Sequence, residues 1–397
     1  MIYLDHAATT AAYPEVVSEM TPYLDRQYFN PSGSYREGRL LHKKLDKIRE
    51  KLAAVIHASP EEIIFTSGGT EADNWVLLNA ARTSSCKGRH IITSSIEHHA
   101  ILHTCGFLEK QGFEVTYLPV TRNGIIDCDM LNDAIRPDTI LISIMYANNE
   151  IGSIMPIAEI GAVCRAKGVL FHTDAVQAVG HLPIDVKAQN IDMLSLSAHK
   201  FHGPKGIGVL YAKQGILLTP IIEGGAQERG KRAGTENIPG IVGMAAALKD
   251  MCDHIDENAA KVSALRDKLI AGLAKIPHSI LNGDPVHRLP GNVNFCFEGI
   301  EGESLLLLLD DKGICASSGS ACTSGSLDPS HVLLSLGMPH EIAHGSLRLT
   351  LSDENTEEDV DYILEVLPPI VERLRSMSPL WERIQKESRP PFQFQDR

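Results

Sequence analysis

Short apolar segments and helical stretches alternate between residues 60 and 215, and this alternation constrains the fold more than any other sequence feature. The segments expected to form strands are Ile63–Thr66, Ile91–Ser94, Val115–Leu118, Thr139–Met145, Val169–His172, Met193–Leu196 and Gly208–Tyr211. Expected helices, among them Glu71–Arg82 and Ile157–Lys167, lie between several of these strands. The pattern predicts an α/β fold with a mostly parallel, seven-stranded sheet covered by helices. Ligands of such sheets bind beyond the carboxyl ends of the strands, so the residues that follow each strand are the first functional candidates.

The pattern changes after about residue 255 and indicates a smaller α+β domain. Its expected elements, in chain order, are Asn258–Lys275, Asn292–Phe297, Glu303–Lys312, Ser346–Leu351 and Glu357–Met377. A chain of 397 residues usually divides into more than one domain. We therefore expect an N-terminal arm at 1–14, a large domain at 15–257, a small domain at 258–377 that carries the Cys322 loop, and a tail at 378–397 with little core of its own.

Composition excludes several classes of protein. The formal charge of −13 disfavours direct nucleic-acid binding, which depends on Lys and Arg. The leucine run at 305–309 is far shorter than the roughly 20 apolar residues of a membrane span, and no secretory signal is visible at residues 1–5, so a cytoplasmic location is expected. The eight cysteines form no CxxC pair, which argues against zinc ribbons and cluster ligation, and we expect no intrinsic metal site.

Two polar motifs directly follow predicted strands. Gly68-Gly69-Thr70 leads into a helix, where unpaired N–H groups and the Thr70 hydroxyl suit a phosphate, although a tight turn with Thr70 as N-cap explains the motif equally well. His98 and His99 follow the next strand. One imidazole could act as acid or base or lie on an aromatic ligand, the pair could bind metal, or both could be surface histidines.

Asp174 and Lys200 follow two further strands. Asp174 is either a helix cap or the group that holds a proton on a heteroaromatic nitrogen, as cofactor enzymes with a pyridine electron sink require. Lys200 has small and hydroxyl-bearing neighbours and precedes a Gly/Pro turn, an unusual place for a solvating cation. A lysine that forms a Schiff base fits this position.

Two candidates lie in the small domain. The segment around Cys322 is rich in Ser and Gly, so Cys322 is either an incidental loop thiol or a nucleophile in a mobile loop. Arg348 lies in an alternating apolar strand and needs an anionic partner, which is a substrate carboxylate or a structural salt bridge.

Together these motifs resemble the cysteine desulfurases of the NifS/IscS group, which are fold-type I pyridoxal-phosphate enzymes of the class-V aminotransferase family. The resemblance covers nearly the whole chain and rests on the ordered motifs Tyr3–Thr10, Ser67–Asn74, Asn148–Gly152, Asp174–Gln177, Ser197–Lys200, Arg232–Thr235 and Ser317–Cys322. The long Ser/Gly-rich stretch places the chain in the group with a long cysteine loop. One departure is Asn30-Pro-Ser-Gly-Ser-Tyr35, where the family usually has Ser and His at positions 33 and 35.

The resemblance implies a role for each matching residue. Lys200 would hold pyridoxal 5′-phosphate covalently and move protons, Asp174 would pair with the ring nitrogen, and His98 would stack on the ring and take part in proton transfer. Arg348 would bind the substrate carboxylate and Cys322 would take up the sulfur. The remaining implied cofactor contacts are Gly69, Thr70, Ser197 and His199 at the phosphate, joined by Thr235 from the second subunit of a homodimer, and Gln177 and Asn149 at the ring or the substrate.

The implied activity is removal of sulfur from L-cysteine to give L-alanine and a persulfide on Cys322. Implied acceptors are an iron–sulfur scaffold, on which Cys322 could transiently ligate a cluster, or a tRNA-thiolating enzyme. A selenocysteine lyase or an aminotransferase on the same fold is the alternative enzyme, and a catalytically idle interaction protein is an alternative of another class.

Overall fold

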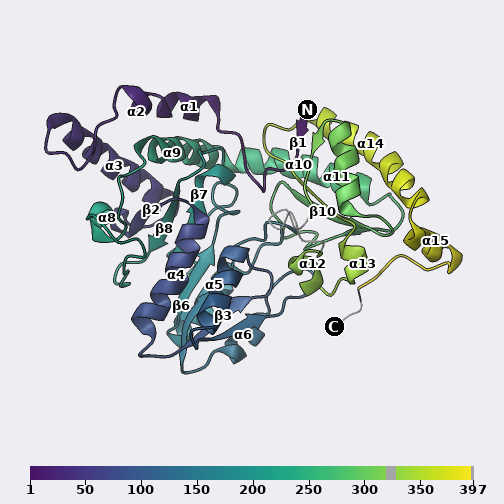
Figure 1. Ribbon diagram of the computed structural model, residues 1–397, viewed down its shortest axis with the longest axis horizontal. Helices are drawn as coiled ribbons and strands as arrows, with labels where there is room; N and C mark the ends of the chain where they lie inside the picture. Colours follow the sequence, from purple (N-terminus) through teal and green to yellow (C-terminus); the bar gives the residue numbers. More distant parts are fainter. Residues whose placement is uncertain (319–327, 395–397) are drawn as a thin grey trace.

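The computed structural model describes residues 1–318 and 328–394, and the larger of its two bodies is built on one mixed sheet (Figure 1). The strand order is β2-β8-β7-β6-β5-β3-β4. The strands are β2 (Ile63–Thr66), β3 (His90–Ser94), β4 (Glu114–Leu118), β5 (Thr139–Ser143), β6 (Leu170–Asp174), β7 (Met193–Ser197) and β8 (Gly208–Ala212). Only the pairs that involve β8 are antiparallel. The predicted α/β fold with a seven-stranded, mostly parallel sheet is confirmed.

Helices cover both faces of this sheet, which explains the nearly continuous apolar character of its central strands. Ile63 and Phe65 belong to one core cluster, whereas Ile64 belongs to a second cluster with Trp75 of α4. The helices of this part are α1 (Pro14–Met20), α2 (Pro22–Asp25), α3 (Arg36–Val55), η1 (Pro60–Glu62), α4 (Gly69–Ser84), α5 (His99–Glu109), α6 (Cys128–Ala134), α7 (Ile157–Lys167), η2 (Ala198–Lys200), α8 (Gln227–Gly230) and α9 (Ile238–Asp253).

The second body has its own antiparallel sheet in the order β12-β10-β9. Its strands are β9 (Ser279–Leu281), β10 (Asn292–Phe297) and β12 (Ser346–Thr350), and its helices are α10 (Ile255–Leu273), α11 (Gly302–Asp311), α12 (His331–Ser335), α13 (His340–Ala343), α14 (Glu357–Ser376) and α15 (Pro379–Lys386). Buried side chains of β10, β12, α10, α11 and α14 form a separate core. The boundaries 15–257 and 258–377 remain our proposal, with the division falling within the first turn of α10.

The N-terminal arm connects the two bodies. Its first strand, β1 (Ile2–Tyr3), pairs in parallel with β11 (Ile314–Cys315), and the fully buried Leu4 belongs to the core of the small domain. Further along, the backbone N–H of Thr10 donates to the carbonyl of His199 at 2.9 Å, directly after strand β7 of the large sheet. The arm therefore runs from the small domain to the carboxyl edge of the large sheet.

The C-terminal segment contains more structure than its composition predicts. Residues Pro379–Lys386 form helix α15, in which Ile384 is buried. Phe392 and Phe394 pack against a core cluster that joins the large domain to Cys296 and to residues of α12 and α13, and the N–H of Phe392 donates to Glu298 Oε1 at 3.0 Å. Among the described residues, no helix combines the length and apolar character needed to cross a membrane.

The packing of the N-terminal arm leads to a prediction that compares Leu4 of the arm with Leu307 of α11. Leu4→Ala removes a fully buried side chain, so we expect the free energy of unfolding to fall by about 2–5 kcal/mol in a denaturant titration. Leu307→Ala removes a side chain that is 73% exposed and should change it by no more than about 0.5 kcal/mol. Equal effects of the two substitutions would show that the arm does not contribute to the core.

Candidate active site

Lys200 lies where the large sheet and the N-terminal arm meet. Strand β7 ends at Ser197, and the short helix η2 places Lys200 one turn later. Its Nζ donates to the carbonyl oxygens of Ala7 at 2.5 Å and Ala8 at 2.7 Å. Gln177 Nε2 donates to the same Ala7 carbonyl at 3.0 Å, so Lys200 and Gln177 converge on one segment of the arm.

Asp174 is the last residue of β6 and lies beside β7, where it pairs in register with Ser195. The strand runs further than predicted because β6 continues to pair with β7 through the polar residues Thr173 and Asp174, beyond the end of its pairing with β5. Asp174 Oδ1 accepts a hydrogen bond from the N–H of Val176 at 2.9 Å; residues 176–180 form turns, so Asp174 does not cap a helix. Burial raises the pKa of Asp174 to about 6, while the positive charge of Lys200 acts in the opposite direction. Asp174 is therefore ionised at neutral pH and faces a cation.

His98 precedes α5 and caps it. The Nδ1 atom accepts a hydrogen bond from the N–H of Ala100 at 3.1 Å, so this nitrogen carries no proton and only Nε2 can donate. Burial, with the charges of Lys200 and His331, lowers the pKa of His98 to about 4. At neutral pH the ring is uncharged, which suits contact with an aromatic ring better than a role as a permanent cation.

Glycines bring the start of α4 close to the strand ends. Gly68 has φ +151°, and a Cβ on Gly69 would lie 2.6 Å from Val176 Cγ2. A Cβ on Gly208 of β8 would lie 2.7 Å from Gly68 Cα. A helix start exposes N–H groups without intrahelical partners. The exposed Thr70 and the buried Ser197 therefore flank a backbone cradle suited to an anion.

Arg348 lies on β12 and is buried, with its guanidinium at the boundary between the domains. Nη2 donates to Asp5 Oδ1 at 2.8 Å and Nη1 donates to the carbonyl of Asn149 at 3.1 Å. Within the described part of the chain, Nε has no hydrogen-bond partner. The structural salt bridge considered from the sequence is thus present, and Arg348 and Asn149 lie together.

Three further predicted site residues differ in what the structure places around them. His199 Nδ1 lies 3.2 Å from the Thr9 hydroxyl, beside Lys200. Thr235 is exposed in the loop between α8 and α9, and no described contact joins it to the other candidates. Cys322 lies outside the described residues.

Sequence reasoning missed the contribution of the arm and of buried carboxyl groups. Asp5 and the carbonyls of Ala7 and Ala8 lie within the quoted motif Tyr3–Thr10, but nothing in the motif indicates their partners. Asp73 and Glu97 are almost fully buried, and burial together with the charge of Asp174 raises the pKa of each. The one indication in the sequence was that Asp73 and Glu97 lie in polar motifs that directly follow predicted strands.

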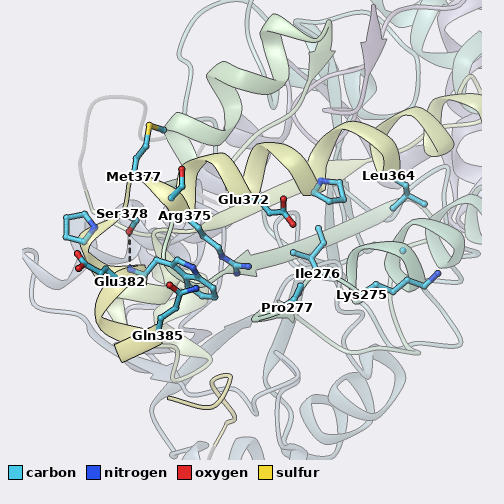
Figure 2. Close-up of a pocket in the computed structure, with 15 residues that line it drawn as sticks. Lys275, Ile276, Pro277, Leu364, Glu372, Arg375, Met377, Ser378, Glu382 and Gln385 are labelled. Carbon is cyan, nitrogen blue, oxygen red and sulfur yellow. Dashed lines mark hydrogen bonds between the residues drawn. The ribbon is translucent and has the colours of Figure 1, made fainter. Parts of the chain in front are cut away.

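One cavity lies away from these residues. It measures about 960 Å³, and Figure 2 shows that its walls come from the end of α10, from α14 and from α15. A smaller cavity is lined by Ala7, Gln177, Lys200 and Thr350, among others, and therefore borders the candidate site.

The residues present suit pyridoxal phosphate. The cradle at Gly68 and Gly69 suits its phosphate, the buried carboxylate of Asp174 suits a protonated ring nitrogen, and Lys200 supplies an amine between them. This set contains one anion for the ring and one cradle for the phosphate, which is the charge pattern that the group requires.

Comparisons with known proteins agree with this arrangement. Residues 2–363 match the class-V aminotransferase family, whose enzymes use pyridoxal phosphate. The chain is 58% identical over 379 residues to the cysteine desulfurase IscS of Methanosarcina thermophila, covering 96% of this chain and 94% of that protein. It is 56% identical over 388 residues to the cysteine desulfurase IscS of Clostridium botulinum strain Hall, covering 97% and 98% of the two chains.

Solved structures show the same relationship. A NifS-like protein superimposes with a TM-score of 0.89 at 39% identity, covering 94% of this chain and all of that chain (100%). SspA in complex with cysteine superimposes with a TM-score of 0.80 at 36% identity, covering 90% of this chain and 100% of that chain. The chain belongs to the class-V aminotransferase family and, within it, to the cysteine desulfurases of the IscS type.

Proposed function

We propose that this chain is a cysteine desulfurase that converts L-cysteine to L-alanine and leaves the sulfur as a persulfide on Cys322. The observation that carries the proposal is the group formed by Lys200, Asp174 and the arm at the carboxyl edge of the large sheet. The full-length similarity to cysteine desulfurases supports the substrate.

Residues at the carboxyl edge of the large sheet would bind the cofactor. Pyridoxal phosphate, when bound, supplies an electron sink for the electron pair released at the amino-acid carbon. Lys200 would bind the cofactor through Nζ, and Asp174 would hold a proton at the ring nitrogen through its buried carboxylate. Gly69, Thr70, Ser197 and His199 would bind the phosphate.

His98 and Lys200 are the groups able to move protons near the substrate. Because Nδ1 of His98 is occupied by the N–H of Ala100, the proton that His98 holds or receives is at Nε2. Its ring would also lie against the cofactor. Gln177 remains available on the other side, where it already contacts the arm.

Arg348 would bind the substrate carboxylate together with Asn149. Its bond to Asp5 shows that the guanidinium already pairs with a carboxylate, and its Nε is a further buried donor that lacks a partner among the described residues. A substrate carboxylate would share or replace Asp5 as the partner of this guanidinium.

Cys322 would act as the sulfur acceptor. The carbon–sulfur bond of cysteine would break and a sulfur–sulfur bond would form at the Cys322 thiolate, which is the soft nucleophile that this transfer requires. The electron pair of the broken bond would stay with carbon, which takes up a proton to give alanine, while the substrate thiol gives up one proton. The negative charge of the thiolate would pass to the outer sulfur of the persulfide, so atoms and charge balance.

The partners and the location belong to the same proposal. Thr235 would reach the phosphate of the other subunit in a homodimer, consistent with its exposed position. The persulfide sulfur would pass to an iron–sulfur scaffold or a tRNA-thiolating enzyme. A cytoplasmic location suits this chemistry, because a reducing compartment keeps the Cys322 thiol available.

Removal of the acceptor thiol should abolish the reaction. For Cys322→Ser we expect sulfide release from L-cysteine with a thiol reductant to fall by more than about a hundredfold, because serine cannot accept sulfur. Cys315→Ser is the matched control, since Cys315 lies in β11 and is half-buried, and it should keep most of the activity. Full activity of Cys322→Ser on selenocysteine or on keto acids, with none on cysteine, would favour the selenocysteine lyase or aminotransferase instead.

Lys200 should be the residue that holds the cofactor covalently. Borohydride reduction of the holoenzyme followed by peptide mapping should locate the cofactor on the Lys200 peptide, and Lys200→Ala should carry no reduced adduct. Lys205→Ala, which changes a nearby exposed lysine, should be labelled like the wild type. A reduced adduct in Lys200→Ala at wild-type yield would assign the amine to another residue.

A further inference from the structure

A second buried carboxyl group lies behind Asp174 and has no role in the function described above. Asp73, on α4, is 1% exposed, and its carboxyl is close enough to Asp174 for the two charges to repel. Glu97 is also fully buried, and burial together with the charge of Asp174 raises the pKa of Glu97 to about 8. Three carboxyl groups thus share one region of low dielectric, and Lys200 is the cation that acts on Asp174.

A chain of hydrogen bonds extends from Asp73 into the sheet. The Ser195 hydroxyl interacts with the carboxyl of Asp73 and lies 2.9 Å from His172 Nε2. His172 Nδ1 lies 2.8 Å from the Ser143 hydroxyl. These side chains are fully buried, and burial lowers the pKa of His172 to about 3, so the imidazole is neutral and provides one donor and one acceptor.

The chain can be satisfied in two directions. If Asp73 bears a proton, it donates to Ser195, Ser195 donates to His172 Nε2, and His172 Nδ1–H donates to Ser143; if Asp73 is ionised, every donor in the chain is reversed. The other oxygen of Asp73 distinguishes the two arrangements. Within the described part of the chain, Oδ1 of Asp73 has no hydrogen-bond partner and lies 3.7 Å from His172 Nε2. A buried carbonyl oxygen of a neutral acid tolerates such a position better than an oxygen of a carboxylate does.

The neighbours of Asp174 favour its negative form, whereas the neighbours of Asp73 favour its protonated form. Asp174 has the N–H of Val176 and the charge of Lys200 to stabilise an anion. Asp73 faces Asp174, Glu97 and neutral His172, none of which is a cation. Burial and the charge of Asp174 raise the pKa of Asp73, the hydrogen bond with Ser195 lowers it, and the net direction is upward.

We propose that Asp73 is a positioning residue that carries a proton in the folded protein and confines the negative charge behind the cofactor site to Asp174. Ser195, which forms part of the chain, is also the strand neighbour of Asp174, and its carbonyl accepts the N–H of Ala175 at 3.0 Å. The chain therefore holds the backbone on both sides of Asp174. This inference rests on the proposed function, because it concerns the partner of the cofactor ring.

Infrared spectroscopy of the full-length holoenzyme measures the proton directly. At about pH 8, where Asp174 is ionised, the wild-type minus Asp73→Asn difference spectrum should contain the C=O band of a protonated acid. Asp310→Asn, which changes an exposed aspartate of α11, should give carboxylate bands instead. If Asp73→Asn gives only carboxylate bands, the proposal is wrong. Wild type labelled with ¹³C in the aspartate carboxyls provides the same test without a variant that must fold: absence of a label-shifted acid band overturns the proposal.

The pH dependence of unfolding provides a readout with an unusual sign. An acid whose pKa is raised by folding keeps a proton that the unfolded chain releases, so wild-type stability should fall as pH rises above the ordinary aspartate range. Asp73→Asn cannot ionise and its amide can still donate to Ser195, so its melting temperature should exceed that of wild type at neutral pH and depend less on pH. A lower melting temperature with an unchanged pH dependence would identify an ordinary structural carboxylate and contradict the proposal.

The cofactor spectrum completes the test. At neutral pH the absorption of Asp73→Asn holoenzyme should equal that of wild type, since a neutral amide replaces a neutral acid, and a shift would show that Asp73 is charged. The infrared and unfolding measurements need no turnover. Sulfide release by the wild type tests the proposed function separately, so failure of one can be distinguished from failure of the other.

Discussion

The hydrogen bonds of the N-terminal arm are the constraint on which the rest of the site depends. Residues of this short segment bond to β11 and β12 in the small domain and to η2 in the large domain. The carbonyls of Ala7 and Ala8 accept from Lys200, while Asp5 pairs with Arg348. The arm thus fixes the distance between the amine at the sheet edge and the guanidinium on β12, which come from different domains.

Burial determines which side chains of the site carry a charge. Asp174 keeps a negative charge because it has a backbone donor and a nearby cation, whereas His98 loses its positive charge in the same environment. Burial favours the neutral form of both groups, and Asp174 has the partners that stabilise its charged form. Asp73, which lacks a cationic neighbour, is the clearest contrast to Asp174, and maintaining such a group in the core reduces stability at neutral pH.

The sequence predicted the elements well wherever an apolar pattern was buried on both faces. Strands Ile63–Thr66 and Asn292–Phe297 and helix Ile157–Lys167 have the predicted bounds. The strand end at Asp174 was missed because the polar residues Thr173 and Asp174 continue the ladder with β7, which an apolar pattern does not indicate. Helix α15 was missed because its few apolar residues gain their stability from contacts with the small domain, which local composition does not reveal.

The candidate site shows the same limit. Lys200, Asp174 and the glycines could be identified because they follow strands whose carboxyl ends share one edge. The partners of Arg348 could not be identified, since Asp5 and Asn149 are distant in sequence and meet only after the domains pack together. Asp73 lies in the motif Ser67–Asn74, but its burial and its neighbours depend on how α4 packs on the sheet, which the motif does not reveal.

The central claim is that the sulfur of L-cysteine moves to Cys322. The most direct measurement is to incubate the holoenzyme with ³⁴S-labelled L-cysteine without reductant, alkylate it, and map the peptides by mass spectrometry while alanine is quantified. We expect the Cys322 peptide to gain one labelled sulfur, in proportion to the alanine formed in the first turnover. Alanine production with the label on another cysteine, or with no labelled peptide at all, would contradict this assignment.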